Sequence, residues 1–351
     1  MFLRRKNNRT KPSEPAKKKE EIKRVETNCL SIFYKIIFLS LSAFLVNIFM
    51  IKKIAKISND DISNLPVNRI LAKSLMKQNG DNGWVVNPGS NNVNGTYNCT
   101  WLDFESKAGN TAKICGHSVR DYITSEIKKH KRWRDCDHLP RIWNETHKTE
   151  RSIYVEIGAN IGSCVMEMLL STNANIVAFE PHPRNQYALQ MSIEALGRSY
   201  QNRVVFIPIA LGSESAQSTI YSGEGNMGNS MLGKFIKDWP NQVEKQDEKH
   251  VIQVEPFSSI LNTYNNIVLM KLDAQGFECN ILDGITQDVA NNIQQIFFEV
   301  SSKFLRPNGC LGLLDKFRNL GFTVYNMNGD EIYDGVRRGT TYDLLAYRKL
   351  F

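Results

Sequence analysis

Two short apolar runs, each followed by a distinctive turn, constrain this chain more than any other feature. Residues 153–162 read IYVEIGANIG, and residues 176–181 read IVAFEP. In a βαβ unit the ends of two such strands lie side by side at the carboxyl edge of a parallel sheet, where open α/β sheets bind ligands. Gly158 and Gly162 lack Cβ and allow a sharp turn close to a ligand, while Glu180 can accept hydrogen bonds from a ribose diol. Together the two runs predict a nucleoside-binding site.

The spacing within the first turn distinguishes between two kinds of nucleoside. Dinucleotide-binding folds use G-x-G-x-x-G to seat a pyrophosphate, whereas this turn reads E-x-G-x-x-x-G, with Asn160 in place of the second glycine. A carboxylate at Glu156 disfavours pyrophosphate but suits a ligand that carries an ammonium and a sulfonium group, so we expect S-adenosyl-L-methionine rather than NAD. The residues predicted to bind it are Glu156, Gly158, Asn160, Gly162, Glu180 and Pro181. The alternative is a βαβ crossover with an incidental glycine turn.

A second group of polar residues follows another apolar strand. Residues 267–284 read IVLMKLDAQGFECNILDG, which carries Lys271 and Asp273 to the end of the strand and places Glu278 at the start of a helix. A lysine in a central strand is costly to bury unless it is paired, and Asp273 lies two residues away on the same face. The next strand ends with Glu299. We expect these four side chains to gather beside the nucleoside pocket.

Strand and helix patterns alternate from residue 152 onward. Strands are expected at residues 153–157, 176–180, 204–209, 267–273, 296–300, 322–325 and 344–347. Helices are expected at residues 163–171, 184–196, 278–285 and 311–320. This rhythm predicts an α/β fold with a doubly wound sheet, whose last two strands form an antiparallel hairpin because their connection is short. Seven strands with such a hairpin are typical of class I (Rossmann-like) methyltransferases.

Three blocks of the sequence carry a resemblance to a known family. They read VEIGANIG from residue 155, FEPHP from residue 179 and KLDAQGFECNILDG over residues 271–284, the last being a narrow K-x-D-x-Q/E-G-x-E-x-x-x-L-x-G pattern. Together they resemble the FkbM family of methyltransferases over about residues 150–348. The resemblance implies a class I fold that uses S-adenosyl-L-methionine to methylate a hydroxyl, often on a sugar or macrolide. It leaves the acceptor open.

Methyl transfer to a hydroxyl calls for a group that removes the hydroxyl proton. We expect Asp273 or Glu278 to act as this base, with Lys271 holding Asp273 in place. Both have structural alternatives, because Glu278 can simply favour a helix N-terminus and Asp273 can serve only as the partner of Lys271. His182 could also act as a base, although we expect it on a solvent-facing loop. A Mg²⁺ ion that orients an acceptor diol is an open alternative, because several carboxylates could converge, but nothing in the spacing requires a metal.

The first fifty residues differ from the rest in charge and hydropathy. Residues 1–28 carry ten Lys or Arg against four Glu, and we expect a disordered cytosolic tail there. Residues 30–51 form an apolar run long enough to cross a hydrocarbon core of about 30 Å. The run lacks a small-residue cleavage site, so we expect an uncleaved type II signal anchor. An amphipathic or buried helix is the alternative.

Residues from about 52 onward would then lie in the lumen of the endoplasmic reticulum or Golgi. The sequons that follow the anchor fit this expectation, with acceptors at Asn94, Asn98 and Asn144. In an oxidising lumen we expect one disulfide among Cys99, Cys115 and Cys136, and sequence alone does not choose the pair. A Cys₂His₂ zinc site formed by Cys115, His117, Cys136 and His138 is a weaker alternative, because its C-x-H spacing is unusual. Cys164 and Cys279 are expected to be small buried side chains.

Segments between the anchor and the sheet carry fewer signals. We expect a stem at residues 52–97, a cysteine-containing lead-in at 98–150 and the methyltransferase domain at 151–351. The charge run at residues 128–134 is expected to be a solvated helix face, with a patch for an acidic acceptor or membrane headgroups as the alternative. The glycine-rich loop at residues 223–233 could form a lid over the acceptor or a plain flexible connection.

The leading hypothesis is a membrane-anchored luminal O-methyltransferase that acts on a glycan or another hydroxyl of the secretory pathway. The net charge of +8 does not indicate a nucleic-acid partner, because much of the basic excess lies in the tail. Two other classes stay open: a catalytically inactive methyltransferase-like binding or scaffold protein, and an NAD-dependent sugar enzyme. Intact Glu156, Gly158, Glu180 and Asp273 argue against the first class, and the altered glycine spacing argues against the second.

Overall fold

The structure, a computed structural model, describes residues 97–149, 151–222, 227–232, 248–261, 266–305, 310–333 and 341–348. All of them belong to the second of two compact units, Leu65–Phe351. The predicted tail, the predicted anchor at 30–51, most of the predicted stem and the sequon at Asn94 lie outside these residues. Within the described ranges, no helix has the length and apolar character needed to cross a membrane.

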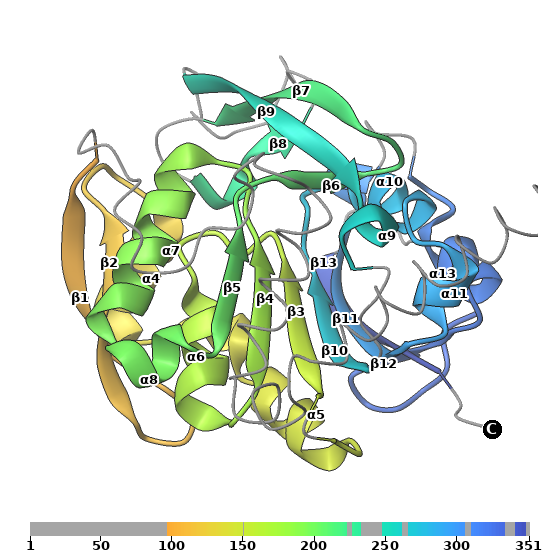
Figure 1. The fold of residues 1–351 in the computed structure, drawn as a ribbon, viewed down its shortest axis with the longest axis horizontal. Helices are drawn as coiled ribbons and strands as arrows, with labels where there is room; N and C mark the ends of the chain where they lie inside the picture. Colours follow the sequence, from red (N-terminus) through yellow and green to blue (C-terminus); the bar gives the residue numbers. More distant parts are fainter. Residues whose placement is uncertain are drawn as a thin grey trace, which may run out of the picture. The chain divides into compact units, whose positions relative to one another are not determined.

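A seven-stranded sheet forms the centre of the described unit (Figure 1). Its order is β12-β13-β11-β10-β3-β4-β5, and β13 runs antiparallel to both of its neighbours while the other pairs are parallel. The strands are β3 (Ile153–Ile157), β4 (Asn175–Phe179), β5 (Val204–Ile207), β10 (Ile267–Leu272), β11 (Ile293–Ser301), β12 (Thr323–Asn326) and β13 (Thr341–Tyr347). The predicted sheet of seven strands with a terminal antiparallel pair is confirmed.

The order of the strands creates a switch point between β3 and β10. The chain proceeds from β3 outward through β4 to β5, and later from β10 outward in the other direction to β11. Crossovers on the two sides of this point therefore diverge, which leaves a crevice at the carboxyl ends of β3 and β10.

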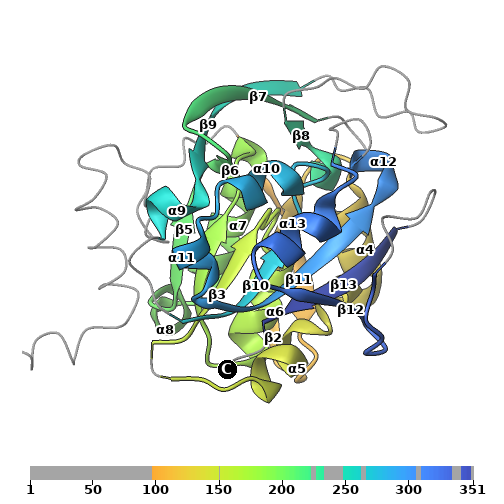
Figure 2. The same cartoon turned by 90° about the vertical axis from the view of Figure 1, so that its right-hand side faces the viewer.

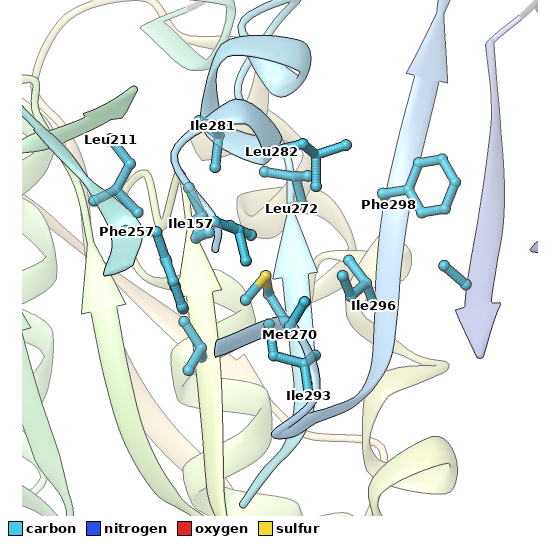
Figure 3. Close-up of a cluster of buried hydrophobic side chains, with 14 of the residues drawn as sticks. Ile157, Leu211, Phe257, Met270, Leu272, Ile281, Leu282, Ile293, Ile296 and Phe298 are labelled. Carbon is cyan, nitrogen blue, oxygen red and sulfur yellow. The ribbon is translucent and has the colours of Figure 1, made fainter. Parts of the chain in front are cut away.

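Helices cover both faces of the sheet, and each face has its own hydrophobic core beneath the helices. Successive strand residues point to opposite faces, so Tyr154 belongs to one core while Val155 belongs to the other. Figure 3 shows part of the core that contains Val155, in which Leu272 lies beside Ile281 and Leu282. The covering helices are α6 (Ser163–Ser171), α7 (Pro183–Ala195), α9 (Phe257–Ile260), α10 (Glu278–Asp283), α11 (Gln287–Ala290) and α13 (Leu313–Asn319), with the short α8 (Arg198–Gln201) and α12 (Ser302–Leu305) beside them.

The lead-in segment is folded and packs on the helices of the sheet. It forms a hairpin of β1 (Cys99–Glu105) and β2 (Thr111–His117), followed by α4 (Tyr122–His130), η1 (Arg134–Cys136) and α5 (Leu139–Glu145). Side chains of the hairpin share a core with residues of α6 and α7. In addition, the backbone N–H of Cys115 donates to Oγ of Ser192 on α7 at 2.9 Å. Within the charge run, Lys128 and Lys129 are exposed at the end of α4.

A second, smaller sheet was not predicted. It consists of β6 (Ala210–Gly212), β7 (Ala216–Ser222), β8 (Met231–Leu232) and β9 (Glu248–Pro256), in the order β6-β9-β7-β8. In both Figure 1 and Figure 2 this sheet lies across the carboxyl ends of the parallel strands. Part of the predicted glycine-rich loop belongs to it, because η2 (Met227–Asn229) leads directly into β8.

Six cysteines form three disulfides: Cys99–Cys115, Cys136–Cys164 and Cys279–Cys310. The expected bridge within the lead-in is therefore Cys99–Cys115. The prediction for Cys164 and Cys279 was wrong, because both are buried but both are bonded to a distant partner. The zinc alternative is also wrong, because Cys115 and Cys136 are in disulfides. Nothing in the sequence places Cys136 against the first turn of α6, since that contact arises only when the lead-in packs on the sheet.

Peptide mapping of the full-length protein without reductant tests this pairing. We expect three linked peptide pairs that match the bonds above. Replacing both Cys136 and Cys164 with Ser should lower the free energy of unfolding by about 3–4 kcal/mol, because the bond closes a loop of 28 residues. Alkylation of Cys164 or Cys279 as a free thiol in the native protein would contradict the structure.

Candidate functional site

A pocket lies at the switch point of the sheet. It encloses about 810 Å³ between its lining atoms, part of it open to solvent. The turn after β3 forms its floor, Glu180 and Pro181 follow β4 along one side, and Lys271 and Asp273 lie at the end of β10. The pocket therefore joins the two groups of residues singled out in the sequence.

The turn after β3 depends on a glycine at position 158. Gly158 has a φ of +81°, and a Cβ atom placed on it would lie 1.9 Å from the carbonyl oxygen of Asp273. Its N–H and that of Ala159 both donate to the carbonyl oxygen of Phe179, each at 3.0 Å. The turns after β3 and β10 thus approach so closely that no other residue fits between them.

The other turn residues have different tasks. Asn160 also has a positive φ, of +53°, and its Oδ1 accepts a hydrogen bond from the N–H of Ile161 at 2.7 Å. Gly162 is the N-cap of α6, and a Cβ on it would lie 2.4 Å from Cδ1 of Leu189 on α7. Gly158, Asn160 and Pro181 line the pocket, whereas Gly162 holds α6 against α7.

Glu180 is buried and held by three N–H donors. Its Oε2 accepts from the backbone N–H of Asn160 at 2.7 Å, and its Oε1 accepts from the N–H of His182 at 2.8 Å and from Nδ2 of Asn185 at 3.3 Å. A carboxylate has about four lone-pair sites, so about one remains for a ligand hydroxyl. Burial raises the pKa of Glu180 to about 7 although these hydrogen bonds oppose the shift.

Lys271 lies among carboxylates of neighbouring strands. Its Nζ is 3.0 Å from Oδ2 of Asp273, which confirms the predicted ion pair. Burial alone would lower the pKa of Lys271, but the charges of Asp273 and Glu156 outweigh burial and raise it. Burial raises the pKa of Glu156 to about 7, and its Oε2 accepts a hydrogen bond from the hydroxyl of Tyr154 at 3.0 Å.

Asp273 is more accessible than the buried carboxylates of Glu156 and Glu278. Its side chain is 25% exposed, and Nε2 of Gln275 donates to its Oδ1 at 2.6 Å while Lys271 binds Oδ2. Both oxygens are thus oriented by a neighbour, and the side chain still lines the pocket. A carboxylate held in this way can accept a proton from a group inside the pocket.

Glu278 lies outside the pocket, against the turn that follows β10. Its Oε1 accepts the backbone N–H groups of Ala274 at 3.0 Å and Gly276 at 3.2 Å. Its Oε2 has no hydrogen-bond partner among the described residues, and burial raises its pKa to about 7. Glu278 and Glu299 line a second, smaller cavity that shares only Asp273 and Gln275 with the pocket. Burial and then the charge of Asp273 raise the pKa of Glu299 to about 8.

Several lining residues come from parts of the sequence that gave no signal. Ile123 and Trp133 reach the pocket from the lead-in, and Met227, Ser230 and Leu232 reach it from η2 and β8. Asp121 joins these two walls, because its Oδ1 accepts the N–H of Met227 at 2.9 Å and its Oδ2 caps α4 through the N–H of Thr124 at 2.8 Å. These residues cover the pocket on the side away from the sheet.

His182 is not on a solvent-facing loop, so that expectation was wrong. It is fully buried as the N-cap of α7, and its Nε2 is 2.7 Å from Oγ of Ser222 on β7. Burial lowers the pKa of His182 to about 3. The small sheet covers His182, which the sequence alone placed on a solvent-facing loop.

Comparison with known protein families gives a match over the central sheet. Residues 156–324 match the family model described as the methyltransferase FkbM domain. The matched range begins at Glu156 and ends within β12, so it contains both carboxylate groups of the site. None of the curated proteins compared with the chain matches it.

Comparison with solved structures finds methyltransferases at low similarity. One is a precorrin-6y C5,15-methyltransferase from Geobacter metallireducens, with 10% identity, 61% of this chain and 88% of the other covered, and a TM-score of 0.32. A second is a SAM-dependent O-methyltransferase from Thermotoga maritima, with 10% identity, coverage of 70% and 77%, and a TM-score of 0.34. A third is a magnesium protoporphyrin IX methyltransferase from Synechocystis with bound SAM, with 9% identity, coverage of 67% and 87%, and a TM-score of 0.36.

Replacing Gly158 with Ala tests the close approach of the two turns. The added methyl group meets a backbone oxygen, so we expect the free energy of unfolding to fall by more than about 2 kcal/mol and the binding of S-adenosylhomocysteine to weaken at least about tenfold. Chemical unfolding and calorimetry measure these two effects.

Gly197→Ala is the matched control for this variant. Gly197 has a similar φ of +85°, but nothing lies within 4 Å of an added Cβ. It should therefore cost only the backbone strain of its φ of +85° and ψ of 173°, about 1–3 kcal/mol, and leave ligand affinity unchanged. Equal losses of affinity in the two variants would show that backbone strain, rather than the contact with Asp273, explains the first.

Proposed function

Because residues 156–324 form an FkbM methyltransferase domain, which uses S-adenosyl-L-methionine, we propose that this protein methylates a hydroxyl group of a glycan. The observation that carries the proposal is the position of Asp273. This carboxylate lines the cofactor pocket and is oriented by Lys271 and Gln275, as a base for a hydroxyl acceptor would need to be.

The pocket residues fit the cofactor. Glu156, Glu180 and Asp273 line the pocket beside the turn at Gly158, and their carboxylates suit the ribose hydroxyls and the positive charges of this cofactor. We assign the ribose to the remaining lone-pair site of Glu180, and the positively charged methionine portion to the side of the pocket that holds Glu156. When bound, S-adenosyl-L-methionine supplies an electrophilic methyl group on a sulfonium.

Asp273 would then take the proton of the acceptor hydroxyl. The ammonium group of Lys271 holds Oδ2 of Asp273 at 3.0 Å and thereby orients the carboxylate in the pocket. General-base catalysis of this kind contributes about 10²–10⁴-fold to a rate. Glu278 contributes as a positioning residue, because it holds the backbone of the turn between Asp273 and α10 through Ala274 and Gly276.

The walls that cover the pocket support a carbohydrate acceptor. Trp133 offers an aromatic ring, and Ser230 offers a hydroxyl, at the side of the pocket built by the lead-in and β8. Aromatic surface combined with hydrogen-bonding groups suits the apolar faces and hydroxyls of a sugar. Asp273 lies within the same pocket, where it can meet a sugar hydroxyl.

We also assign the domain to the lumen of the secretory pathway, anchored through residues 30–51. Three disulfides support an oxidising compartment. The sequon residues Asn98 and Asn144 are both exposed, so a glycan could be attached to either without disturbing the fold. The apolar run and the basic tail before it support the orientation.

The variant Asp273→Asn tests the proposed base. We expect the rate of methyl transfer to glycans from secretory membranes to fall about 10²–10⁴-fold. Affinity for S-adenosylhomocysteine should change less than about threefold, because Asn keeps the shape and one acceptor oxygen. Incorporation of radiolabelled methyl groups and calorimetry provide the two readouts.

Asp103→Asn is the matched control, since Asp103 forms an exposed pair with Lys113 on the hairpin. It should leave both the transfer rate and the affinity unchanged. A wild-type transfer rate in Asp273→Asn would rule out Asp273 as the base.

Treatment of the full-length protein with an N-glycosidase tests the assignment to the lumen. We expect a faster-migrating band after treatment of protein from animal or yeast cells. The shift should become smaller in Asn98→Gln and in Asn144→Gln. No change of mobility in the wild type would contradict a luminal domain.

A further inference from the structure

A group of three metal-ligand side chains lies outside the cofactor pocket. His182, Glu248 and His250 each offer a nitrogen or oxygen atom, and these atoms all lie within 4.8 Å of one another. We propose that the three residues bind one zinc ion, which links the small sheet to the N-terminus of α7.

Two separate elements bring the ligands together. His182 is the buried N-cap of α7, directly after the turn that carries Glu180. Glu248 and His250 are two residues apart at the start of β9, so their side chains leave the strand on the same face. The rings of His182 and His250 meet edge to face, with their centroids 5.1 Å apart.

The distances allow an ion after small movements of the side chains. Zinc bonds of about 2.0–2.1 Å in a tetrahedron place the ligand atoms about 3.4 Å apart. Nε2 of His250 and Oε1 of Glu248 are 2.7 Å apart and share a hydrogen bond, which two bonds to the ion would replace. The remaining distances need to close by at most about 1.4 Å, which is within the reach of side-chain rotation. Nε2 of His182 is 2.7 Å from Oγ of Ser222, and its Nδ1 accepts the N–H of Arg184 at 3.3 Å. A bond from Nε2 to the ion would replace both contacts, because the ring proton would then be on Nδ1.

A neighbouring arginine orients the carboxylate of Glu248, as is common for carboxylates that bind metals. Arg184 donates to Oε2 of Glu248 from Nε at 3.3 Å and from Nη2 at 3.1 Å, which leaves Oε1 turned toward His250. Ligating carboxylates are usually oriented by such a hydrogen bond to their other oxygen. The guanidinium of Arg184 and the nearby His117 are the basic groups that face the cluster. Two imidazoles and one carboxylate form a donor set that suits zinc better than calcium or magnesium.

An ion at this site would connect two walls of the cofactor pocket from outside the pocket. The N–H of His182 donates to Oε1 of Glu180 at 2.8 Å, so the backbone that positions Glu180 also carries a ligand of the ion. On the other side, β9 pairs with β7, whose Ile220 lines the pocket. The ion would therefore fasten the sheet that covers the pocket to the turn that forms its wall.

Metal analysis of the full-length protein, without a polyhistidine tag, tests the proposal. After removal of metal with a chelator and addition of Zn²⁺, we expect one ion per chain by mass spectrometry and a rise of several degrees in the thermal midpoint. His250→Ala and Glu248→Gln should each lower the bound zinc at least about tenfold and remove the rise. Glu248→Gln keeps the hydrogen-bonding shape of the site, so it separates loss of a ligand from loss of the fold.

His147→Ala is the matched control, because His147 is exposed on the loop after α5 and lies outside the cluster. It should bind zinc and gain stability as the wild type does. These readouts need no cofactor or acceptor, so they are independent of the proposed methyl transfer. Absence of bound zinc with an unchanged midpoint in the wild type, or an equal rise in His250→Ala, would overturn the proposal.

Discussion

The ammonium group of Lys271 lies 3.0 Å from Oδ2 of Asp273 and is buried beside Glu156, which pairs with Lys271 across β3 and β10. Without this cation, the carboxylates at these strand ends would be buried next to one another with no opposite charge. A buried charge that loses its partner costs about 3–5 kcal/mol. Lys271 therefore allows the sheet to present acidic side chains at its switch point, and both the pocket and the proposed base depend on it.

The crevice is completed by the contact between two turns. Gly158 lies against the carbonyl oxygen of Asp273, so the turn proposed to hold the nucleoside also fixes the backbone of the proposed base. Glu278 holds the turn after β10, which begins at Asp273, through two backbone N–H groups. Donor and acceptor would thus be positioned by one rigid unit, which suits a reaction whose main requirement is alignment.

Much of the central sheet could be predicted from the sequence, because its strands are buried apolar runs that end at glycine or at a charged residue. β3 and α6 have the bounds that the pattern predicts. β4 is displaced by one residue at each end and β10 ends one residue earlier than predicted, so Glu180 and Asp273 directly follow their strands. The small sheet could not be predicted, since β7 is polar over most of its length and its longest pairing is with β9, far along the chain. The hairpin of the lead-in likewise packs on helices that follow it in the sequence.

The contrast between local patterns and contacts of distant segments also explains which site residues could be predicted. Glu156, Gly158 and Asp273 belong to local patterns with a chemical reason for each residue type, so sequence alone identified them. Trp133 and Met227 reach the pocket only through tertiary packing, as the hydrogen bond from Met227 to Asp121 shows. The buried position of His182 and the bond between Cys136 and Cys164 also depend on contacts that no local pattern contains.

The pKa values of Glu156 and Glu180 allow a direct test of whether this pocket binds the cofactor. Glu156 and Glu180 both have a pKa of about 7, so both are largely ionised at pH 8 and largely protonated at pH 6. A calorimetric titration of the full-length protein with S-adenosylhomocysteine at these two pH values is the most direct test. We predict binding of one ligand per chain at pH 8 and clearly weaker binding at pH 6. No binding at either pH would contradict the assignment of this pocket to the cofactor.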